Sequence, residues 1–340
     1  MTDIFSIKPL IIAEVAQAHE GSVGLAHSFI EAAADAGADA VKFQTHMAGA
    51  ESTLDEPFRI RMSSQDATRY DYWKRMEFTV EQWHEFKAHC DERGVLFLSS
   101  PFSLEAVELL GSVGVAAWKI GSGEIYSRDM LSAVAQRPEP VLLSSGMSPW
   151  VHLDKAVQLL QQENSQFAVF QCTSKYPTPF SEVGLNVLSE LRARYECPVG
   201  LSDHSGTPFP AIAAMALGCE LIEAHVTFDR KMYGPDAVAS VEFEELALMC
   251  RARDAIRDML AHPLDKDAIA DDLADMRAKF GKSLAPREAL AAGTRLERDM
   301  LTLKKPATGI PAAEIDKVVG RVLVNPVQPD RLLKWKDLND

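Results

Sequence analysis

Apolar and polar residues form two alternating patterns over the first 260 residues of the chain. The longer stretches repeat apolar residues three and four positions apart, as Leu153, Ala156, Val157 and Leu160 do, which is the spacing of one helix face. Between them lie short runs that are apolar at consecutive positions, as strands buried on both faces are. We predict strands over residues 10–15, 38–44, 95–99, 115–120, 140–144, 167–172, 199–202 and 220–225. We predict helices over residues 24–36, 80–93, 104–110, 128–136, 152–162, 185–195, 208–217 and 243–260.

Eight strand–helix units in succession predict an α/β fold in which the strands close into a (β/α)8 TIM barrel. The alternative is an open doubly wound sheet, which normally carries a glycine-rich phosphate-binding turn after its first strand. The turn here, Ala16-Gln-Ala-His-Glu-Gly21, has no such pattern. The pattern therefore favours the closed barrel.

Two boundaries, and so three segments, follow from shifts in composition. Residues 1–260 form the barrel, 261–282 are charged and helix-favouring and form a linker, and 283–340 form a small turn-rich domain. A core of fewer than 60 residues has low stability of its own, so we expect this domain to dock on a barrel, in its own chain or a partner's. Residues 47–78 are too long for a simple loop and form either a lid or a packed excursion around their own aromatic residues.

Composition excludes several classes of function. The sequence has no apolar run of about 18 residues, so no membrane span is expected, and its first residues do not resemble a secretory signal. Five cysteines without close spacing are typical of reduced thiols in a cytoplasmic protein. The net charge of −14 argues against nucleic acid as a partner. An anionic substrate would need a local group of lysines.

The ligand site of a β/α barrel lies at the carboxyl ends of its strands. The polar residues at or just beyond these ends are Glu14, Lys42, Gln44, Ser99, Ser100, Lys119, Ser122, Glu124, Ser144, Ser145, Thr173, Tyr176, Ser202, Asp203, His204, Glu223 and His225. A single serine here is more often a turn residue. Two lysines with several hydroxyl groups match a phosphate or carboxylate in charge and in hydrogen-bond donors.

Lys119 and Glu124 flank a Gly-Ser-Gly turn. Small residues in such a turn let backbone N–H groups approach a ligand closely. A cation and a carboxylate on either side suggest an anion to hold and a proton to move. The alternative is a plain salt bridge at the end of a strand.

His204 and His225 end neighbouring strands, so their rings could bind one metal ion. Two imidazoles with open positions suit Mn²⁺, Co²⁺, Fe²⁺ or Zn²⁺ acting as a Lewis acid. A lone histidine would more often be structural. His19 and Glu20 in the first loop are secondary candidates.

Eight ordered motifs together resemble the sialic acid (nonulosonic acid) synthase family. They are Glu14-Val-Ala-Gln-Ala-His-Glu-Gly-Ser22, Val41-Lys-Phe-Gln-Thr-His46, Ser99-Ser-Pro-Phe-Ser103, Lys119-Ile-Gly-Ser-Gly-Glu124, Leu143-Ser-Ser-Gly-Met147, Tyr176-Pro-Thr-Pro179, Gly200-Leu-Ser-Asp-His204 and Gly234-Pro-Asp236. Residues 283–340 resemble the family's C-terminal antifreeze-like (SAF) domain, so the resemblance covers nearly the whole chain. It implies condensation of phosphoenolpyruvate with an N-acyl-mannosamine or related amino-hexose, with release of phosphate by C–O cleavage.

The resemblance also implies roles for matched residues. Those expected to hold the phosphate and carboxylate of phosphoenolpyruvate are Lys42, Gln44, Ser100, Lys119, Ser122, Ser144 and Ser202. Those expected to face the sugar are Tyr176, Asp236, Glu14 and Glu124, and the two glutamates would move protons. Lys119 counts with Glu14, Glu124 and Asp236 as catalytic. His204 and His225 would bind the metal, Mn²⁺ in the first place, with Mg²⁺ or Co²⁺ as alternatives. The family further implies a domain-swapped homodimer.

Two departures from the family pattern fall on the sugar side. Lys305 stands where the SAF domain usually supplies an arginine to the sugar's N-acyl group, and lysine lacks the planar fork of arginine. Ala18 stands before His19 where the family commonly has asparagine. The identity of the sugar and of its acyl group is therefore left open.

Three rival functions stay open. A phosphoenolpyruvate-condensing barrel acting on a phosphorylated aldose, of the 3-deoxy-octulosonate or heptulosonate type, should need a second phosphate site, and the strand ends offer no spare cluster of lysine or arginine. A non-catalytic sugar-binding barrel would be expected to have lost Lys119, Glu124 or a histidine. A metal-dependent hydrolase or isomerase would not explain two lysines at separate strand ends.

Overall fold

The computed structural model describes residues 4–6, 9–62 and 64–339 of the 340-residue chain. The chain divides into two compact units, Met1–Ala261 and His262–Asp340. Each unit has a hydrophobic core of its own. Among the residues that the structure describes, no helix is both long and apolar enough to cross a membrane.

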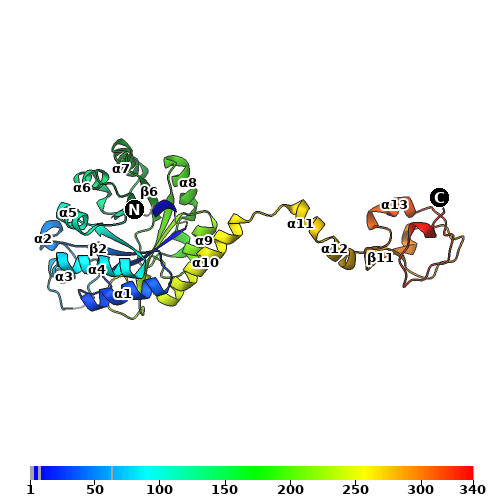
Figure 1. Cartoon of the computed structure of the whole chain (residues 1–340), viewed down its shortest axis with the longest axis horizontal. Coiled ribbons are helices and arrows are strands. Elements are labelled where there is room, and N and C mark those ends of the chain that lie inside the picture. The colour runs from blue at the N-terminus through cyan, green and yellow to red at the C-terminus, as the bar shows by residue number, and fades with distance from the viewer. Residues whose placement is uncertain (1–3, 7–8, 63, 340) are drawn as a thin grey trace. The chain divides into compact units, whose positions relative to one another are not determined.

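The first unit is a closed ring of eight parallel strands with helices around it (Figure 1). The strands are β1 (Leu10–Ala16), β2 (Ala40–Thr45), β3 (Leu96–Pro101), β4 (Trp118–Ile120), β5 (Val141–Ser144), β6 (Phe167–Cys172), β7 (Val199–Asp203) and β8 (Leu221–Thr227). Each strand pairs with the next, and β1 also pairs with β8 from Leu10 to Glu14, which closes the ring. The predicted barrel is confirmed. Strand β4 is shorter than predicted, because within the described ladder only Trp118 is in register with β3.

Helices connect the strands on the outside of the ring. They are α1 (Val23–Asp35), α4 (Val80–Arg93), α5 (Leu104–Val113), α6 (Arg128–Ala135), α7 (Trp150–Gln162), α8 (Leu185–Tyr195), α9 (Phe209–Ala216) and α10 (Phe243–Ala261). Local sequence sets their ends. Thr79 and Gln82 form a reciprocal capping box at the start of α4, and Gly94, at φ 70°, ends that helix in the left-handed conformation. A short strand, β9 (Val241–Glu242), pairs with β8.

Side chains of the strands alternate between the helix layer and the barrel interior. Toward the amino ends of the strands, the interior is filled by a cluster of ten buried apolar residues: Ile4, Leu10, Ile12, Ala40, Leu98, Ala117, Leu142, Ala168, Phe170 and Leu221. A Cβ atom at Gly200 would lie 2.5 Å from the Phe170 ring, so this glycine makes room for the largest residue of the cluster. Two positions further along six of the strands the side chain is polar; these residues are Glu14, Lys42, Ser100, Lys119, Ser144 and Glu223. The apolar cluster therefore forms a floor beneath a polar layer.

The long segment 47–78 contains α2 (Ala48–Glu51) and α3 (Arg69–Met76). Trp73 and Met76 are buried against Ala48, so part of the segment packs around its own apolar residues. Arg75 donates to both carboxylate oxygens of Asp66 within the segment, and it anchors the segment to the barrel by donating to Glu20 in the first loop. The segment is therefore a packed excursion, and it also borders the cavity described below.

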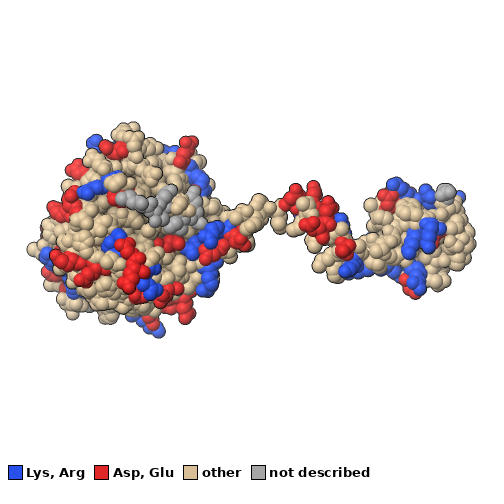
Figure 2. Space-filling model, viewed as in Figure 1, with Lys and Arg blue, Asp and Glu red and all other residues tan. Residues whose placement is uncertain are grey.

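The second unit is small and irregular. Its helices are α11 (Lys266–Asp272), α12 (Ala274–Phe280) and α13 (Ile315–Val318), and its strands β10 (Ser283–Pro286) and β11 (Leu301–Lys304) pair antiparallel. The predicted linker thus holds two short helices, and Figure 2 shows the acidic side chains that gather over α11. Ten buried apolar residues between Leu284 and Leu338 form the core.

Candidate active site

The carboxyl ends of the barrel strands border one cavity of about 1030 Å³. Thirteen of the predicted site residues line it: Glu14, Lys42, Gln44, Ser100, Lys119, Ser122, Glu124, Ser144, Tyr176, Ser202, His204, His225 and Asp236. Strands that are far apart in sequence bring them together, because the ring places all eight carboxyl ends at one mouth. Their common location is as predicted, and the role of each remains a prediction.

Two buried lysines form the bottom of the cavity. Lys42 Nζ lies 2.6 Å from Glu14 Oε2 and donates to Ser100 Oγ at 3.3 Å. Lys119 Nζ donates to Ser144 Oγ at 2.7 Å and to Glu223 Oε1 at 3.0 Å. The Lys119 ammonium also lies 5.0 Å from the centroid of the Phe170 ring, which belongs to the apolar floor. Both cations are therefore fixed in position before any ligand arrives.

Glu223 joins the two lysines, and the sequence interpretation gave it no role. Besides Lys119 it faces Lys42 at 3.8 Å, and Ser202 Oγ donates to it at 3.0 Å. The signal was present in the strand, because Leu221, Glu223 and His225 alternate on one face of β8. The sequence could not show that Glu223 on β8 lies within hydrogen-bond distance of Lys119 on β4, across the barrel.

Glu14 and Glu223 differ in their affinity for a proton. Burial raises the pKa of Glu14 to about 7; the nearby Lys42 acts against this shift and the charge of Glu223 adds to it. Burial alone would raise the pKa of Glu223 too, but the ammonium groups of Lys119 and Lys42 outweigh it and hold that pKa well below its usual range. Two neighbouring carboxyl groups with separated pKa values are typical of acid–base sites. Glu14 is thus the one that takes up a proton.

The turn after β4 presents a hydroxyl and a carboxyl group to the cavity. Ser122 Oγ accepts a hydrogen bond from the Gly146 N–H at 3.0 Å. Glu124 begins a short 3-10 helix (Glu124–Tyr126), and burial, followed by the charge of Glu51, raises its pKa. Lys119 is paired with Glu223 rather than with Glu124. The plain salt bridge across the turn, which was the alternative interpretation, is therefore not formed.

His204 and His225 lie side by side, with ring centroids 5.2 Å apart. His204 Nδ1 is 3.0 Å from the Thr173 carbonyl, and its Nε2 is 3.2 Å from the Tyr176 hydroxyl. Burial lowers the pKa of His225 to about 3, so this imidazole is neutral, as a metal ligand must be. Burial also acts against a proton on His204, but contacts with Cys172 and Thr173 outweigh it and raise its pKa.

The two imidazoles fit a metal site with few protein ligands. Within the described part of the chain, no group of three or more His, Cys, Asp or Glu residues is arranged to hold a metal ion. An ion held by His204 and His225 would therefore take its other ligands from water or from substrate. This donor set suits a Lewis acid with open positions rather than a closed structural site.

Arg59 in segment 47–78 reaches the part of the cavity that Tyr176 and Asp236 border, and the sequence interpretation gave it no role. Its Nη2 donates to Asp236 Oδ1 at 2.5 Å, and its guanidinium carbon lies 4.4 Å from the centroid of the Tyr176 ring. Arg69 and Arg75 border the same cavity and are paired with Glu56 and with Asp66, respectively. No local pattern around Arg59 could have indicated this, because the contact spans 177 residues.

Two further candidates lie elsewhere. His19 is buried beside Phe78, at 4.6 Å between ring centroids, and its Nδ1 accepts from the Gly21 N–H, so it is a structural residue of the first loop. Its companion Glu20 does border the cavity. Lys305 belongs to the second unit, where its ammonium lies 5.4 Å from the centroid of the Phe280 ring. Its predicted contact with a sugar remains a prediction.

Comparison with known families agrees with this geometry. The profile of the NeuB family matches residues 29–264, and that of the SAF domain matches residues 281–339. The chain belongs to the NeuB family. The resemblance predicted from the ordered motifs is thereby confirmed.

NeuB-family relatives match the chain over nearly its full length. The N,N'-diacetyllegionaminic acid synthase of Campylobacter jejuni is 32% identical over 96% of this chain and 99% of its own. The N-acetylneuraminate-9-phosphate synthase of Homo sapiens is 32% identical over 94% of this chain and 90% of its own. Among solved structures, the N-acetylneuraminic acid synthetase of Leptospira borgpetersenii superimposes with a TM-score of 0.70 at 31% identity, over 79% of this chain and 91% of its own.

Proposed function

We propose that this protein is a nonulosonic acid synthase, which condenses phosphoenolpyruvate with an amino-hexose and releases phosphate. One observation carries the proposal: two buried lysines and the serine hydroxyls beside them share the bottom of a single cavity. The names of two NeuB-family relatives, an N,N'-diacetyllegionaminic acid synthase and an N-acetylneuraminate-9-phosphate synthase, support the same reaction class.

The bottom of the cavity suits the two anionic groups of phosphoenolpyruvate. Lys42 and Lys119 supply two positive charges, and Glu223 supplies one negative charge. Because burial raises the pKa of Glu14 to about 7, the four groups have a net charge between 0 and +1 near neutral pH, so the two lysines offer an anion a buried site without excess negative charge, and the ionised form of Glu14 can still accept a proton. The hydroxyls of Ser100 and Ser144 accept from the two lysines and can donate their own hydrogens to the same anion.

The reaction forms one carbon–carbon bond and needs two proton transfers with the protein and one within the intermediate. C3 of phosphoenolpyruvate attacks the aldehyde carbon of the open-chain sugar, and the oxygen of that aldehyde takes a proton from Glu124, whose raised pKa favours the acid form. Water then adds at C2 and gives a proton to Glu14. The bond between C2 and the bridging oxygen of the phosphate then breaks, the C2 hydroxyl gives its proton to the departing phosphate, and C2 becomes a ketone. Holding both substrates in one cavity supplies much of the rate.

His204 and His225 are the residues that would hold a divalent cation, for which the resemblance favours Mn²⁺, with Mg²⁺ or Co²⁺ as alternatives. When bound, such an ion would supply Lewis-acid polarisation of the aldehyde oxygen. Tyr176 and Asp236 lie beside these histidines and would orient the sugar's hydroxyl groups, with Arg59 holding the Asp236 carboxylate in place.

A condensing enzyme for phosphorylated aldoses is the second candidate, because Arg59, Arg69 and Arg75 border the cavity. Each of the three is, however, already paired with a carboxylate. A phosphate bound there would have to displace Asp236, Glu56 or Glu20. The geometry therefore favours a sugar without phosphate.

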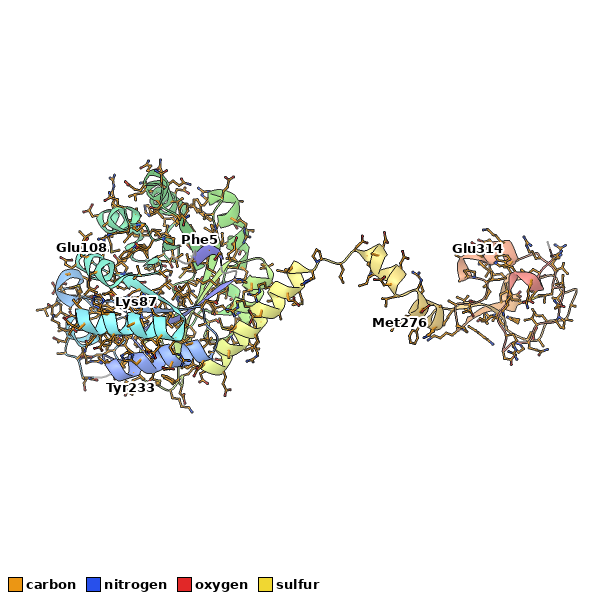
Figure 3. The ribbon with its side chains drawn as sticks, in the orientation of Figure 1. Phe5, Lys87, Glu108, Tyr233, Met276 and Glu314 are labelled. Atoms are coloured by element: carbon orange, nitrogen blue, oxygen red, sulfur yellow. The ribbon has the colours of Figure 1, made fainter. Side chains whose placement is uncertain are left out.

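Exposed apolar side chains of the linker, residues 261–282, support a domain-swapped homodimer. The most exposed are Leu264 (76%), Phe280 (63%), Met276 (54%) and Leu273 (48%), and Figure 3 labels Met276 on α12. In such a dimer the second unit of one chain would cover the partner's barrel and bring Lys305 to its cavity. Light scattering should give twice the chain mass of 37.4 kDa. A monomer at micromolar concentration would contradict the dimer.

The function is tested by incubating the protein with phosphoenolpyruvate, Mn²⁺ and a panel of sugars. The panel contains N-acetylmannosamine, its 6-phosphate and diacetamido-hexoses. We expect phosphate release together with a product whose mass equals the sugar plus pyruvate. Release of phosphate without such a product, or no release with any sugar, would exclude the synthase.

Removing divalent metal is expected to abolish turnover. Protein treated with a chelator and then freed of it should lose at least about 99% of its rate, because the developing charge on the aldehyde oxygen loses several kcal/mol of stabilisation. Added Mn²⁺ should restore the rate, and the His204→Gln variant should need far more Mn²⁺ to do so. Full turnover by the chelator-treated protein would exclude the proposed metal.

A further inference from the structure

The imidazole of His46, which follows β2, is held between two aromatic rings. Its centroid lies 3.9 Å from that of Trp73, with the planes 18° apart, and 4.3 Å from that of Phe102, with the planes 17° apart. The side chain is only 3% exposed. Two nearly parallel neighbours fix the plane of the ring, so its two nitrogen atoms can form hydrogen bonds only in set directions.

A chain of amides connects His46 with the bottom of the cavity. Gln44 Nε2 donates to Glu14 Oε1 at 2.8 Å, and Gln17 Nε2 lies 2.5 Å from Gln44 Oε1 and 2.7 Å from His46 Nε2. Turning the Gln17 amide over would place its oxygen against the Gln44 oxygen, so the nitrogen faces both neighbours. His46 Nε2 also lies 3.2 Å from Gln44 Oε1, so its own contacts include both a donor and an acceptor. The Glu51 carboxylate beside Nδ1 can only accept, so the ring carries a proton on Nδ1.

This proton position determines what His46 does to Glu51. The Nδ1–H donates to Glu51 Oε1 at 2.6 Å. Glu51 is the last residue of α2, its side chain is 8% exposed, and it borders the cavity. One oxygen of the carboxylate is therefore fixed by a ring that is itself fixed from both sides.

The other oxygen, Glu51 Oε2, is buried and has no hydrogen-bond partner among the residues that the structure describes. An ionised carboxylate accepts at both oxygens, and a buried acceptor without a donor is destabilising. Such an atom in the wall of a cavity is explained when a ligand brings the donor. A carboxylate in this position also repels a phosphate.

We propose that Glu51 accepts a hydrogen bond from a hydroxyl or amide N–H of the acceptor sugar, and that His46 positions it. This inference rests on the proposed function and adds to it a binding group that the motifs did not indicate. Glu51 is a binding residue and His46 a positioning residue. The ligand class is a neutral polyhydroxylated amido-sugar.

The Glu51→Gln variant tests the contact with little change in shape. The amide oxygen continues to accept a hydrogen bond from His46, while an NH₂ group replaces Oε2. This NH₂ group cannot accept the hydrogen bond that the sugar donates. We expect KM for the preferred sugar to rise about tenfold to a hundredfold, since a hydrogen bond to a charged group is lost. KM for phosphoenolpyruvate should stay within about twofold, because Glu51 is not bonded to either lysine.

Sugar analogues identify the group that Glu51 binds. Mannose lacks the acylamino group of N-acetylmannosamine, and the 4-deoxy and 6-deoxy derivatives each lack one hydroxyl. For the analogue that lacks the bound group, KM of the wild type should rise about as much as KM for the parent sugar rises in Glu51→Gln. In the Glu51→Gln variant, the same analogue should have a KM close to that of the parent sugar. That non-additivity assigns the contact to the amide N–H or to a particular hydroxyl.

Two variants of His46 separate positioning from packing. His46→Phe keeps an aromatic ring between Trp73 and Phe102 and removes the donor to Glu51, so KM for the sugar should rise by a large part of the Glu51→Gln effect. His46→Asn places an amide near the position of Nδ1 and should restore part of the affinity. A purely structural role would lower the melting temperature in both variants and leave the ratio of the two KM values unchanged.

The outcomes distinguish this inference from the function on which it rests. If the wild type releases phosphate and forms product, but Glu51→Gln has an unchanged KM for every sugar, the Glu51 contact is excluded and the synthase stands. If the wild type turns over none of the sugars, both the synthase function and the Glu51 contact are excluded. A lower KM of the wild type for N-acetylmannosamine 6-phosphate than for N-acetylmannosamine would also overturn the proposed ligand class.

Discussion

Replacing Lys119 by methionine is expected to lower kcat/KM for phosphoenolpyruvate by about a thousandfold. The Lys119 ammonium is buried, and Ser144 and Glu223 fix its position. Methionine has a similar volume and fills the space above Phe170 without supplying a charge. Steady-state kinetics with phosphoenolpyruvate as the varied substrate measures the loss.

The same substitution is expected to destabilise the barrel, because it leaves the Glu223 carboxylate buried with one cation fewer. Removing one partner of a buried ion pair lowers the free energy of unfolding by about 3 kcal/mol, measured by urea denaturation. The double variant Lys119→Met, Glu223→Gln removes the charge left behind. It should regain most of the stability and none of the activity, which separates the two roles of the lysine.

Lys175→Met is the matched control. Lys175 pairs with Glu182, and its side chain is 58% exposed, so its loss should change the free energy of unfolding by less than about 0.5 kcal/mol and leave turnover unaltered. Retention of more than a tenth of wild-type kcat/KM by Lys119→Met would show that this ammonium does not hold the substrate.

A rising limb with an apparent pKa near 7 is expected in the pH profile of kcat/KM, because burial raises the pKa of Glu14 to about 7. The carboxylate form of Glu14 takes the proton from the attacking water. Below the pKa this form is scarce, and the rate should fall about tenfold for each pH unit. Above it the rate should level off. An acid role for Glu14 would give a falling limb instead.

Variants assign the limb to its residue. Glu14→Gln should lose about a hundredfold to ten-thousandfold in kcat/KM, and the remaining activity should show no limb near pH 7. Glu124→Gln should keep the limb, since its carboxyl group acts in the other proton transfer. Glu190→Gln, an exposed change on α8, should leave the profile unaltered. A limb that persists in Glu14→Gln would exclude Glu14 as the titrating base.

The position of the site was predictable because strand side chains alternate with a period of two. Ile12 and Glu14, Ala40 and Lys42, and Leu221 and Glu223 each lie on the inner face of one strand. In every case the apolar residue precedes the polar one. The change from core to site can therefore be read along each strand, once the strands are known to close into a ring.

The partners within the site were not predictable in this way. Lys119 pairs with Glu223, which is 104 residues away, and not with Glu124, which is five residues away along the sequence. Segment 47–78 brings Arg59 to Asp236, 177 residues away. These contacts depend on distances across the barrel and on the fold of a long connection, for which no local pattern exists.

The sequence by itself determined the order of strands and helices, the closed barrel, the family, and the set of polar residues at its mouth. It did so because periodicity and capping are local properties, and because the ordered motifs span nearly the whole chain. Only the tertiary structure decided which carboxylate holds which lysine, which of two glutamates is protonated, and where a buried oxygen lacks a partner. Those properties depend on burial and on distances of a few ångströms between residues far apart in the chain, and they exist only once the ring has closed.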